Sequence, residues 1–163
     1  RLSSAASDVY KRQLVVSWEV VIGIETHVQL KTRNKIFSRA SINNTSEPNT
    51  AVDFVDIGLP GTLPIFNSDV IECAVKFGSA INAKINLNSY FERKNYFYPD
   101  LPKGYQISQF AVPIVEKGEL FLYKNFEKKI KITRAHLEED AGKLIHDSIP
   151  QASAVDYLSL IHI

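Results

Sequence analysis

The clearest pattern near the start of the chain is an alternation of residue types over positions 18–30. One side is apolar and consists of Val20, Ile22, Ile24, Val28 and Leu30, interrupted by Thr26; the other side consists of Val21, Gly23, Glu25, His27 and Gln29. A period of two predicts a β-strand with one dry face. The polar, Asn- and Ser-rich residues 32–50 that follow predict a long, loosely ordered loop.

A helical period replaces this alternation after the turn signal PGTLP at residues 60–64. Apolar residues recur at helical spacing as Val70, Ala74, Phe77 and Ile81. Asn67 or Ser68 can cap the first turn, where Asp69 complements the helix dipole. The spacing predicts a helix over residues 69–83.

The period returns to two after this helix. The apolar side contains Ile85, Leu87, Phe91 and Phe97, and the opposite side contains Asn88, Tyr90, Glu92, Lys94, Tyr96 and Tyr98. The sequence then predicts a loop over 99–104, a hairpin over 112–122 that turns at Glu116–Gly118, and a strand containing Ile130 and Ile132. One helix among hairpin-linked strands predicts an α+β fold with one main helix and a largely antiparallel sheet.

Composition narrows the class of protein without naming a function. The 163 residues contain 19 Lys plus Arg and 18 Asp plus Glu, for a net charge of +1, which excludes a strongly basic nucleic-acid module. No apolar run is long enough for a transmembrane helix, so no membrane association is expected. The single cysteine, Cys73, excludes a disulfide scaffold and fits a reducing compartment; its place in the predicted helix favours a buried structural thiol.

Glu25 and His27 are the first candidates for chemistry, because residues two apart on a strand project from the same face. Such a pair can converge on one cation, or it can simply belong to the solvated side of an edge strand. The run from His136 to Lys143 places three carboxylates side by side, and these repel one another unless a cation neutralises them. Mg²⁺ is the natural partner, although an exposed acidic turn is the alternative. The period does not determine whether Glu138 or Glu139 points inward.

The stretch KNYFYPDLPKGYQISQ, residues 94–109, is too polar for a pure core segment. Its lysines and tyrosines favour a polar cavity or conduit, although basic groups interleaved with aromatic ones are also typical of single-stranded nucleic-acid binding. No phosphate-binding P-loop, dinucleotide-binding glycine motif or nucleophile elbow is present in the sequence.

Five strings together resemble the GatB/GatE family of tRNA-dependent amidotransferase components: WEVVIGIETHVQLKT, EPNT, GLPGTLP, FERKNYFYPDLPKGYQISQ and ITRAHLEEDAGKLIHD. The resemblance implies a glutamine-synthetase-like catalytic cradle and a glutamine-hydrolysing glutaminyl-tRNA synthase type of ligase. In that reaction ATP phosphorylates the carboxylate of Glu or Asp carried on tRNA(Gln) or tRNA(Asn), and ammonia then displaces phosphate. The ammonia comes through a channel from a GatA-type glutaminase subunit, with a GatC-type small subunit completing a heterotrimer. The implied location is the cytoplasm, or the mitochondrial matrix in a eukaryote.

The resemblance also implies roles for individual residues. His27 and Glu139 match positions that hold Mg²⁺, with Glu25 beside them, and Glu139 also matches the residue proposed to gate ammonia at the mouth of the channel. Glu25, Glu138 and Glu139 are therefore the candidate catalytic carboxylates. Five side chains fall in the block that borders the channel: Lys94, Tyr96, Tyr98, Lys103 and Tyr105.

The sequence departs from the family in two respects. Many relatives carry four zinc-binding cysteines at places that here read Ser38–Ser41 and Phe54–Ile57, so no structural zinc is expected and the loop from Asn34 to Thr50 is expected to be mobile. The chain contains no methionine, and its two ends do not match the family. We therefore expect a non-native or disordered extension over 1–16, a partial catalytic domain over 17–157 and a non-native tail over 158–163.

A fragment of this kind is expected to be inactive alone, because a further metal ligand and the tRNA-binding parts lie outside it. Two other interpretations remain at this stage. One is a non-enzymatic tRNA- or subunit-docking module that uses the lysines and tyrosines of residues 94–109. The other is a solvated α+β domain with no site, which requires Glu25, His27 and Glu139 to diverge into water.

Overall fold

A computed structural model describes residues 18–42, 47–123, 128–149 and 152–157. The fold is α+β, as predicted, with one main helix and antiparallel strand pairing. The elements are α2 (Asp69–Ala80), β1 (Lys84–Ile85), β2 (Glu92–Asn95), β3 (Tyr105–Ser108), β4 (Val115–Leu122), β5 (Lys128–Ala135), β6 (Lys143–Ile149) and β7 (Ala152–Asp156). They form three small sheets, β1-β4-β5, β2-β3 and β6-β7. No helix in the described ranges is long and apolar enough to span a membrane.

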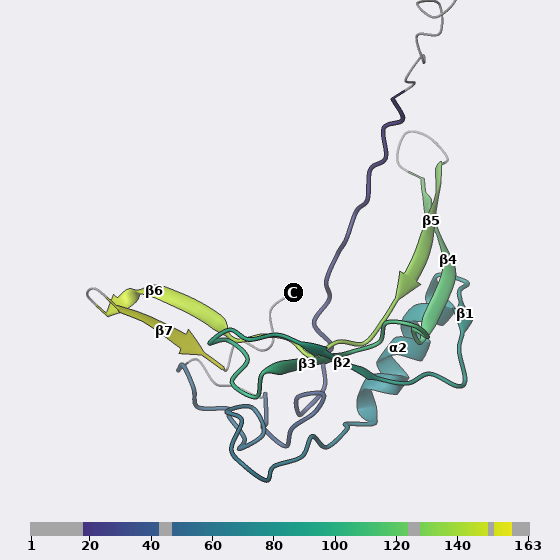
Figure 1. The fold of residues 1–163 in the computed structure, drawn as a ribbon. Helices are drawn as coiled ribbons and strands as arrows, with labels where there is room; N and C mark the ends of the chain where they lie inside the picture. Colours follow the sequence, from purple (N-terminus) through teal and green to yellow (C-terminus); the bar gives the residue numbers. More distant parts are fainter. Residues whose placement is uncertain (1–17, 43–46, 124–127, 150–151, 158–163) are drawn as a thin grey trace, which may run out of the picture.

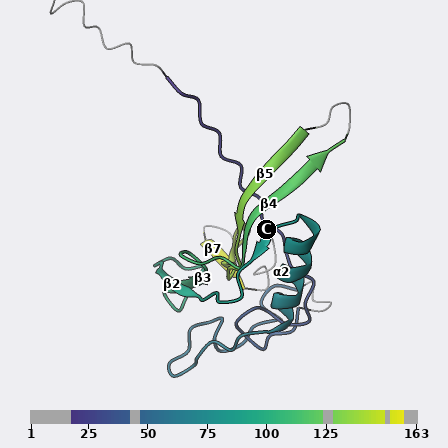
Figure 2. The same ribbon diagram turned by 90° about the vertical axis from the view of Figure 1, so that its right-hand side faces the viewer.

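Helix α2 packs along the base of the β1-β4-β5 sheet, as the two views in Figures 1 and 2 show. The core between them contains Val70, Ala74 and Ile81 from the predicted apolar stripe, together with Ile114, Val115 and Leu137. The fourth stripe residue, Phe77, is half exposed, and Gly78 is buried in its place. The Asn67 side chain accepts a hydrogen bond from the Asp69 amide at 3.0 Å, whereas Ser68 makes no side-chain cap.

The predicted strand over residues 18–30 is wrong for the described part of the chain. The segment is extended and leaves the body of the molecule in Figures 1 and 2, but no described strand pairs with it. Its large apolar side chains are therefore exposed, with 90% of Trp18 and 87% of Ile24 accessible. A period of two favours a strand, but a strand forms only where a neighbouring strand supplies hydrogen bonds. Leu30, at the end of the segment, does pack against the core.

The predicted turn at Glu116–Gly118 is also wrong. Strand β4 passes through these residues without interruption, and the β4–β5 connection lies between Leu122 and Lys128. A Cβ atom on Gly118 would lie 2.4 Å from Cδ1 of Ile81. The glycine is therefore required by close packing against the end of α2, and Lys117 takes a φ of 58° without breaking the strand pairing.

The loop after residue 32 is more tightly packed than its composition predicts. Lys35 donates a 3.0 Å hydrogen bond to Asp56 and a 2.8 Å hydrogen bond to the Tyr157 carbonyl oxygen, and Ser38 donates a 3.1 Å bond to the same carboxylate. All three polar side chains are buried, and so is Phe37. This buried network joins the described part of the loop to residues 53–56 and to the end of β7. Residues 43–46 of the loop lie outside the described ranges.

The alternation predicted for residues 85–98 holds only in part. Strand β2 is short, and two residues of the predicted apolar side, Leu87 and Phe97, are 93% and 86% exposed. Phe91 does reach the core, where its ring meets Phe37 edge to face at 5.1 Å. The extensions predicted over 1–16 and 158–163 lie outside the described residues.

Candidate functional site

The β2–β3 hairpin and the loop joining its strands form the frame of the candidate site. Lys94 lies opposite Gln106 and Asn95 opposite Tyr105 in the antiparallel register. The loop closes with a hydrogen bond of 3.0 Å from the Tyr96 amide to the Gly104 carbonyl oxygen, and Gly104 has a φ of 77° that favours glycine. Leu101 is buried beneath the loop. This turn brings Lys103 back toward strand β3.

The acidic segment after β5 is anchored to the same strand. The Glu139 amide donates a 2.9 Å hydrogen bond to the Ile107 carbonyl oxygen, and Nε2 of Gln106 donates one of 2.6 Å to the Glu139 carbonyl oxygen. The Ile107 amide in turn donates a 3.2 Å bond to Oε2 of Glu139. These contacts fix both the backbone and the carboxylate of Glu139.

Lys103 and Glu139 form a buried ion pair at this point. Nζ of Lys103 donates a hydrogen bond to Oε1 of Glu139, and only 8% of each side chain is exposed. The Tyr105 ring lies within reach of two cations, 5.2 Å from the Lys103 ammonium and 5.4 Å from the Arg93 guanidinium. The structure therefore gathers Lys103, Tyr105 and Glu139, which belong to two separate groups in the sequence.

Burial raises the pKa of the Glu139 carboxyl, because the charged form loses its hydration. The Lys103 ammonium and the Ile107 amide act in the opposite direction, since both favour the carboxylate form. The net direction is upward. Glu139 is therefore a stronger base than a solvated glutamate, while a fixed cation remains beside it.

Glu138 points to a different environment from its neighbour. Its Oε2 accepts a 2.9 Å hydrogen bond from Ser108 and lies 3.6 Å from Nε2 of His136. The side chain is about a third exposed, whereas Glu139 is buried. The structure thus answers the question that the period left open, since Glu139 is the inward carboxylate.

Glu25 and His27 contact each other but no other predicted site residue within the described ranges. Oε1 of Glu25 lies 3.1 Å from Nε2 of His27, and 81% and 50% of these side chains are exposed. Both belong to the unpaired segment that leaves the body of the molecule in Figure 1. In the described parts of the chain no group of three or more His, Cys, Asp and Glu side chains is arranged to hold a metal ion.

As these side chains lie, they do not fit a magnesium ion. Both carboxylate oxygens of Glu139 accept hydrogen bonds, one from the Lys103 ammonium and one from the Ile107 amide. A cation at Glu139 would have to displace that ammonium. Coordination of Mg²⁺ by His27, Glu25 and Glu139, and the use of ATP, therefore stay predictions.

The remaining predicted channel residues lie at the surface of the same hairpin and its loop. Lys94 is exposed on β2; Tyr96 is 37% exposed and donates a 3.3 Å hydrogen bond to Asp100, and Tyr98 is 52% exposed. Sequence analysis missed Arg93 and Gln106, which contact Tyr105 and Glu139 directly. Pairing β2 with β3 in sequence would have identified them, because it places both strands beside Tyr105.

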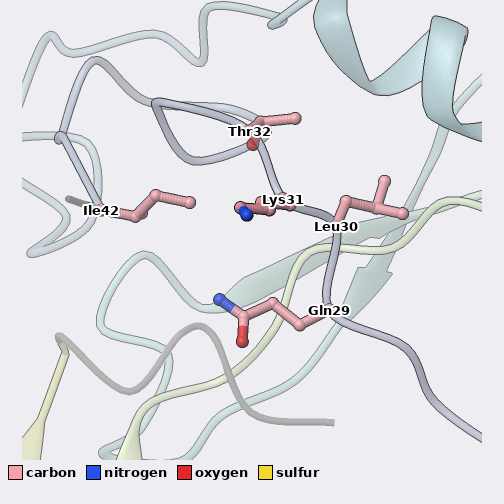
Figure 3. A pocket seen from close by; sticks show the side chains of 5 residues that line it. All are labelled: Gln29, Leu30, Lys31, Thr32 and Ile42. Carbon is pink, nitrogen blue, oxygen red and sulfur yellow. The ribbon is translucent and has the colours of Figure 1, made fainter.

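None of the predicted site residues lines the pocket shown in Figure 3. This pocket of about 240 Å³ is lined by Gln29, Leu30, Lys31, Thr32 and Ile42. Thr32 uses its hydroxyl group within its own turn, donating a 2.7 Å hydrogen bond to the Asn34 carbonyl oxygen. We therefore place the candidate site at the buried ion pair and not at this pocket.

Residues 20–160 match the family described as the GatB/GatE catalytic domain. The chain belongs to this family. Three relatives, each named as the GatB-type component of an aspartyl/glutamyl-tRNA(Asn/Gln) amidotransferase, illustrate the similarity. The Methylobacillus flagellatus protein is 58% identical over 86% of this chain, the Moraxella catarrhalis protein 55% over 88%, and the Pseudomonas fluorescens protein 54% over 86%.

This GatB/GatE chain spans about 30% of the length of each of these relatives. The matched region includes both the unpaired segment with Glu25 and His27 and the buried ion pair of Lys103 and Glu139. Its relatives are GatB-type components of an amidotransferase, which confirms the predicted family role.

Proposed function

We propose that the chain forms part of the amidating centre of an aspartyl/glutamyl-tRNA(Asn/Gln) amidotransferase. Membership of the GatB/GatE family and the names of its relatives support this assignment. In the proposed reaction, ATP transfers its terminal phosphoryl group to the side-chain carboxylate of tRNA-borne Glu or Asp, and ADP leaves. The nitrogen of ammonia then attacks the activated carbonyl carbon, and phosphate leaves with the electrons of its C–O bond.

The observation that carries the chemical part of the proposal is the burial of the Glu139 carboxylate beside the Lys103 ammonium. Ammonium has no lone pair and cannot attack a carbonyl carbon, so it must lose a proton first. A carboxylate whose pKa is raised by burial accepts that proton more readily than a solvated one. We assign Glu139 this role, with Lys103 and the Ile107 amide holding it in place.

The lysine and tyrosine block gives the proposed approach to Glu139. Lys103 and Tyr105 lie at the buried end, while Lys94, Tyr96 and Tyr98 lie at the exposed end of the same hairpin and loop. Ammonia is expected to come from a GatA-type glutaminase subunit, and a GatC-type subunit is expected to complete the complex. Binding of Mg²⁺ near His27 and Glu25 is part of the same proposal, and no step is assigned to it.

The test uses the full-length protein assembled with its partners and measures amide formation on Glu-tRNA(Gln). Glu139→Gln should abolish amidation with glutamine as the donor and leave glutamine hydrolysis measurable. With ammonium chloride as the donor, raising the pH supplies free ammonia, so the variant should regain part of its rate. A purely structural role for Glu139 would not produce such a rescue.

Glu72→Gln is the matched control, because it removes an exposed carboxylate on α2 that pairs with Lys76. It should amidate at the rate of the parent protein. Lys94→Ala should slow turnover with glutamine but not with ammonium chloride. Unchanged amide formation by Glu139→Gln would overturn the assignment of Glu139.

A further inference from the structure

The β4–β5 ribbon projects from the body of the molecule beyond helix α2, as both Figure 1 and Figure 2 show. Strand β1 pairs only with Val115 and Glu116, so the rest of β4 has a partner on one side only. The outer half of the ribbon comprises residues 117–123 and 128–131. A two-stranded ribbon of this kind has two accessible faces.

The register divides the outer ribbon into two different faces. Directly opposite residues, and residues two apart on one strand, lie on the same face. Glu119 is opposite Lys131, and Phe121 is opposite Lys129. On the other face Leu120 is opposite Ile130, and Leu122 is opposite Lys128. We call the first set, with Tyr123, the basic–aromatic face: Glu119, Phe121, Tyr123, Lys129 and Lys131.

Side-chain contacts confirm this assignment. Phe121 and Tyr123 stack with ring centroids 6.4 Å apart and an interplanar angle of 26°. The Lys129 ammonium lies 5.7 Å from the centroid of Phe121 and pairs with the carboxylate of Glu119. The rings are nevertheless accessible, with 45% of Phe121 and 77% of Tyr123 exposed. They form a stacking surface with an open side.

The outer ribbon is more basic than the chain as a whole. It carries four lysines, at 117, 128, 129 and 131, against the single carboxylate of Glu119, whereas the entire chain has a net charge of +1. A pocket of about 500 Å³ lies at the base of the ribbon, with Lys117, Glu119, Lys131 and Thr133 among its lining residues. Positive charge therefore borders both the aromatic rings and a hollow.

We propose that the basic–aromatic face binds the unpaired end of an RNA substrate. Aromatic rings stack on unpaired bases, and lysines contact the phosphates between them, which is how proteins commonly hold single-stranded RNA. A protein partner fits less well, because lysine is depleted at protein–protein interfaces. This inference rests on the proposed function, in which the substrate is an aminoacylated tRNA whose unpaired 3′ end carries the amino acid.

The experiment measures binding of tRNA to the full-length protein at several salt concentrations. Lys131→Ala should lower the slope of log affinity against log salt concentration by about 0.7, the value for one lost phosphate contact to a single strand. Lys128→Ala removes the same charge from the opposite face of the same ribbon and should change neither affinity nor slope. Glu119→Gln removes the only carboxylate of the face and should tighten binding.

Stacking is tested with Tyr123→Ala, which removes an exposed ring. Affinity should fall about fivefold or more, the effect of losing one base–aromatic stack. The same variant should bind a tRNA trimmed of its unpaired 3′ end with the parent's affinity, because the interacting base is then absent. Leu122→Ala, on the opposite face, is the control and should bind both RNAs like the parent.

Two results would overturn the proposal. One is parental affinity in both Lys131→Ala and Tyr123→Ala. The other is an equal loss in the variants of the two faces, which would indicate unspecific attraction or a protein contact instead. Amide formation is measured in parallel on the same proteins. If the parent amidates Glu-tRNA(Gln) while the ribbon variants bind normally, only this inference fails; if the parent does not amidate, the proposed function fails.

Discussion

The Lys103 ammonium donates a hydrogen bond to the Glu139 carboxylate inside the protein, although the two residues are 36 positions apart in sequence. The pair connects the loop between β2 and β3 to the acidic segment that follows β5. Because each side chain is only 8% exposed, each charge depends on the other for compensation that water does not provide.

Removing the cation from this pair should therefore destabilise the protein. Lys103→Met leaves the Glu139 carboxylate buried with only the Ile107 amide as a partner, and we expect a loss of about 3–5 kcal/mol in the free energy of unfolding. Urea denaturation of the full-length protein measures this loss. The double variant Lys103→Met/Glu139→Leu should recover much of it, since no uncompensated charge remains.

Lys76→Met is the control for this experiment. It breaks an ion pair of the same kind with Glu72, but both side chains lie on the exposed surface of α2. No measurable change is expected, because water solvates the remaining carboxylate. Equal effects of Lys103→Met and Lys76→Met would show that the pair of Lys103 and Glu139 is solvated.

The buried pair of Lys35 and Asp56 predicts a dependence of stability on alkaline pH. Burial lowers the pKa of Lys35 below its ordinary value of 10.5, and the Asp56 carboxylate only partly opposes this effect. Between the lowered pKa and 10.5 the folded protein binds fewer protons than the unfolded chain, so stability rises with pH. The contribution is complete above 10.5 and is lost as the pH falls through the lowered pKa.

The measurement compares the parent with Lys35→Met in urea at several pH values between about 8 and 10, a range below the ordinary pKa of a lysine. The difference in free energy of unfolding should shift in favour of the parent as the pH rises, because only the parent carries the titrating group. Lys84→Met, which removes a lysine whose side chain is 59% exposed, should show a difference that does not vary with pH. A constant difference for Lys35→Met as well would contradict the prediction.

Helix α2 could be predicted from the sequence because its determinants are local. The apolar spacing from Val70 to Ile81 and the cap at Asn67 lie within or beside the segment itself, and the predicted end lies only three residues beyond the observed one at Ala80. The strand predicted over 18–30 has an equally clear period. Its pairing depends on another strand, however, and no period within the segment indicates where that strand is.

The candidate site was predictable in membership but not in arrangement. The acidic run and the lysine–tyrosine block supplied Glu139, Lys103 and Tyr105, but their contact depends on how the segment after β5 aligns with Ile107. The error at Gly118 has a similar origin. A glycine can indicate a turn or close packing, and only the approach of Ile81 distinguishes the two.

Close packing at Gly118 leads to a third prediction. A Cβ atom there would lie 2.4 and 2.9 Å from two carbon atoms of Ile81 and 3.3 Å from Cβ of Ala83. Gly118→Ala should therefore cost about 1–3 kcal/mol, as expected for an overpacked core. Thermal unfolding measures the effect. Gly23→Ala is the control, because nothing lies within 4 Å of a Cβ atom at that position, and a loss no greater than that of Gly23→Ala would show that the helix moves aside freely.

A single buried amide side chain, that of Gln109, joins three parts of the fold. Its Oε1 accepts hydrogen bonds from the Ile114 amide at 3.2 Å and the Leu137 amide at 3.1 Å. Its Nε2 donates a 2.6 Å bond to Oγ of Ser89. Only 2% of the residue is exposed, so no water can replace these bonds without a structural change.

Gln109→Leu should consequently be among the more destabilising substitutions in this chain. It leaves the amides of Ile114 and Leu137 without an acceptor, at roughly 1–3 kcal/mol for each buried donor. We expect a total loss of about 2–6 kcal/mol in urea denaturation, together with faster hydrogen exchange at these two amides. Gln29→Leu, an exposed change of the same type, should be neutral. Unchanged exchange at Ile114 and Leu137 in Gln109→Leu would mean that other groups satisfy these amides, and the joining role of Gln109 would be wrong.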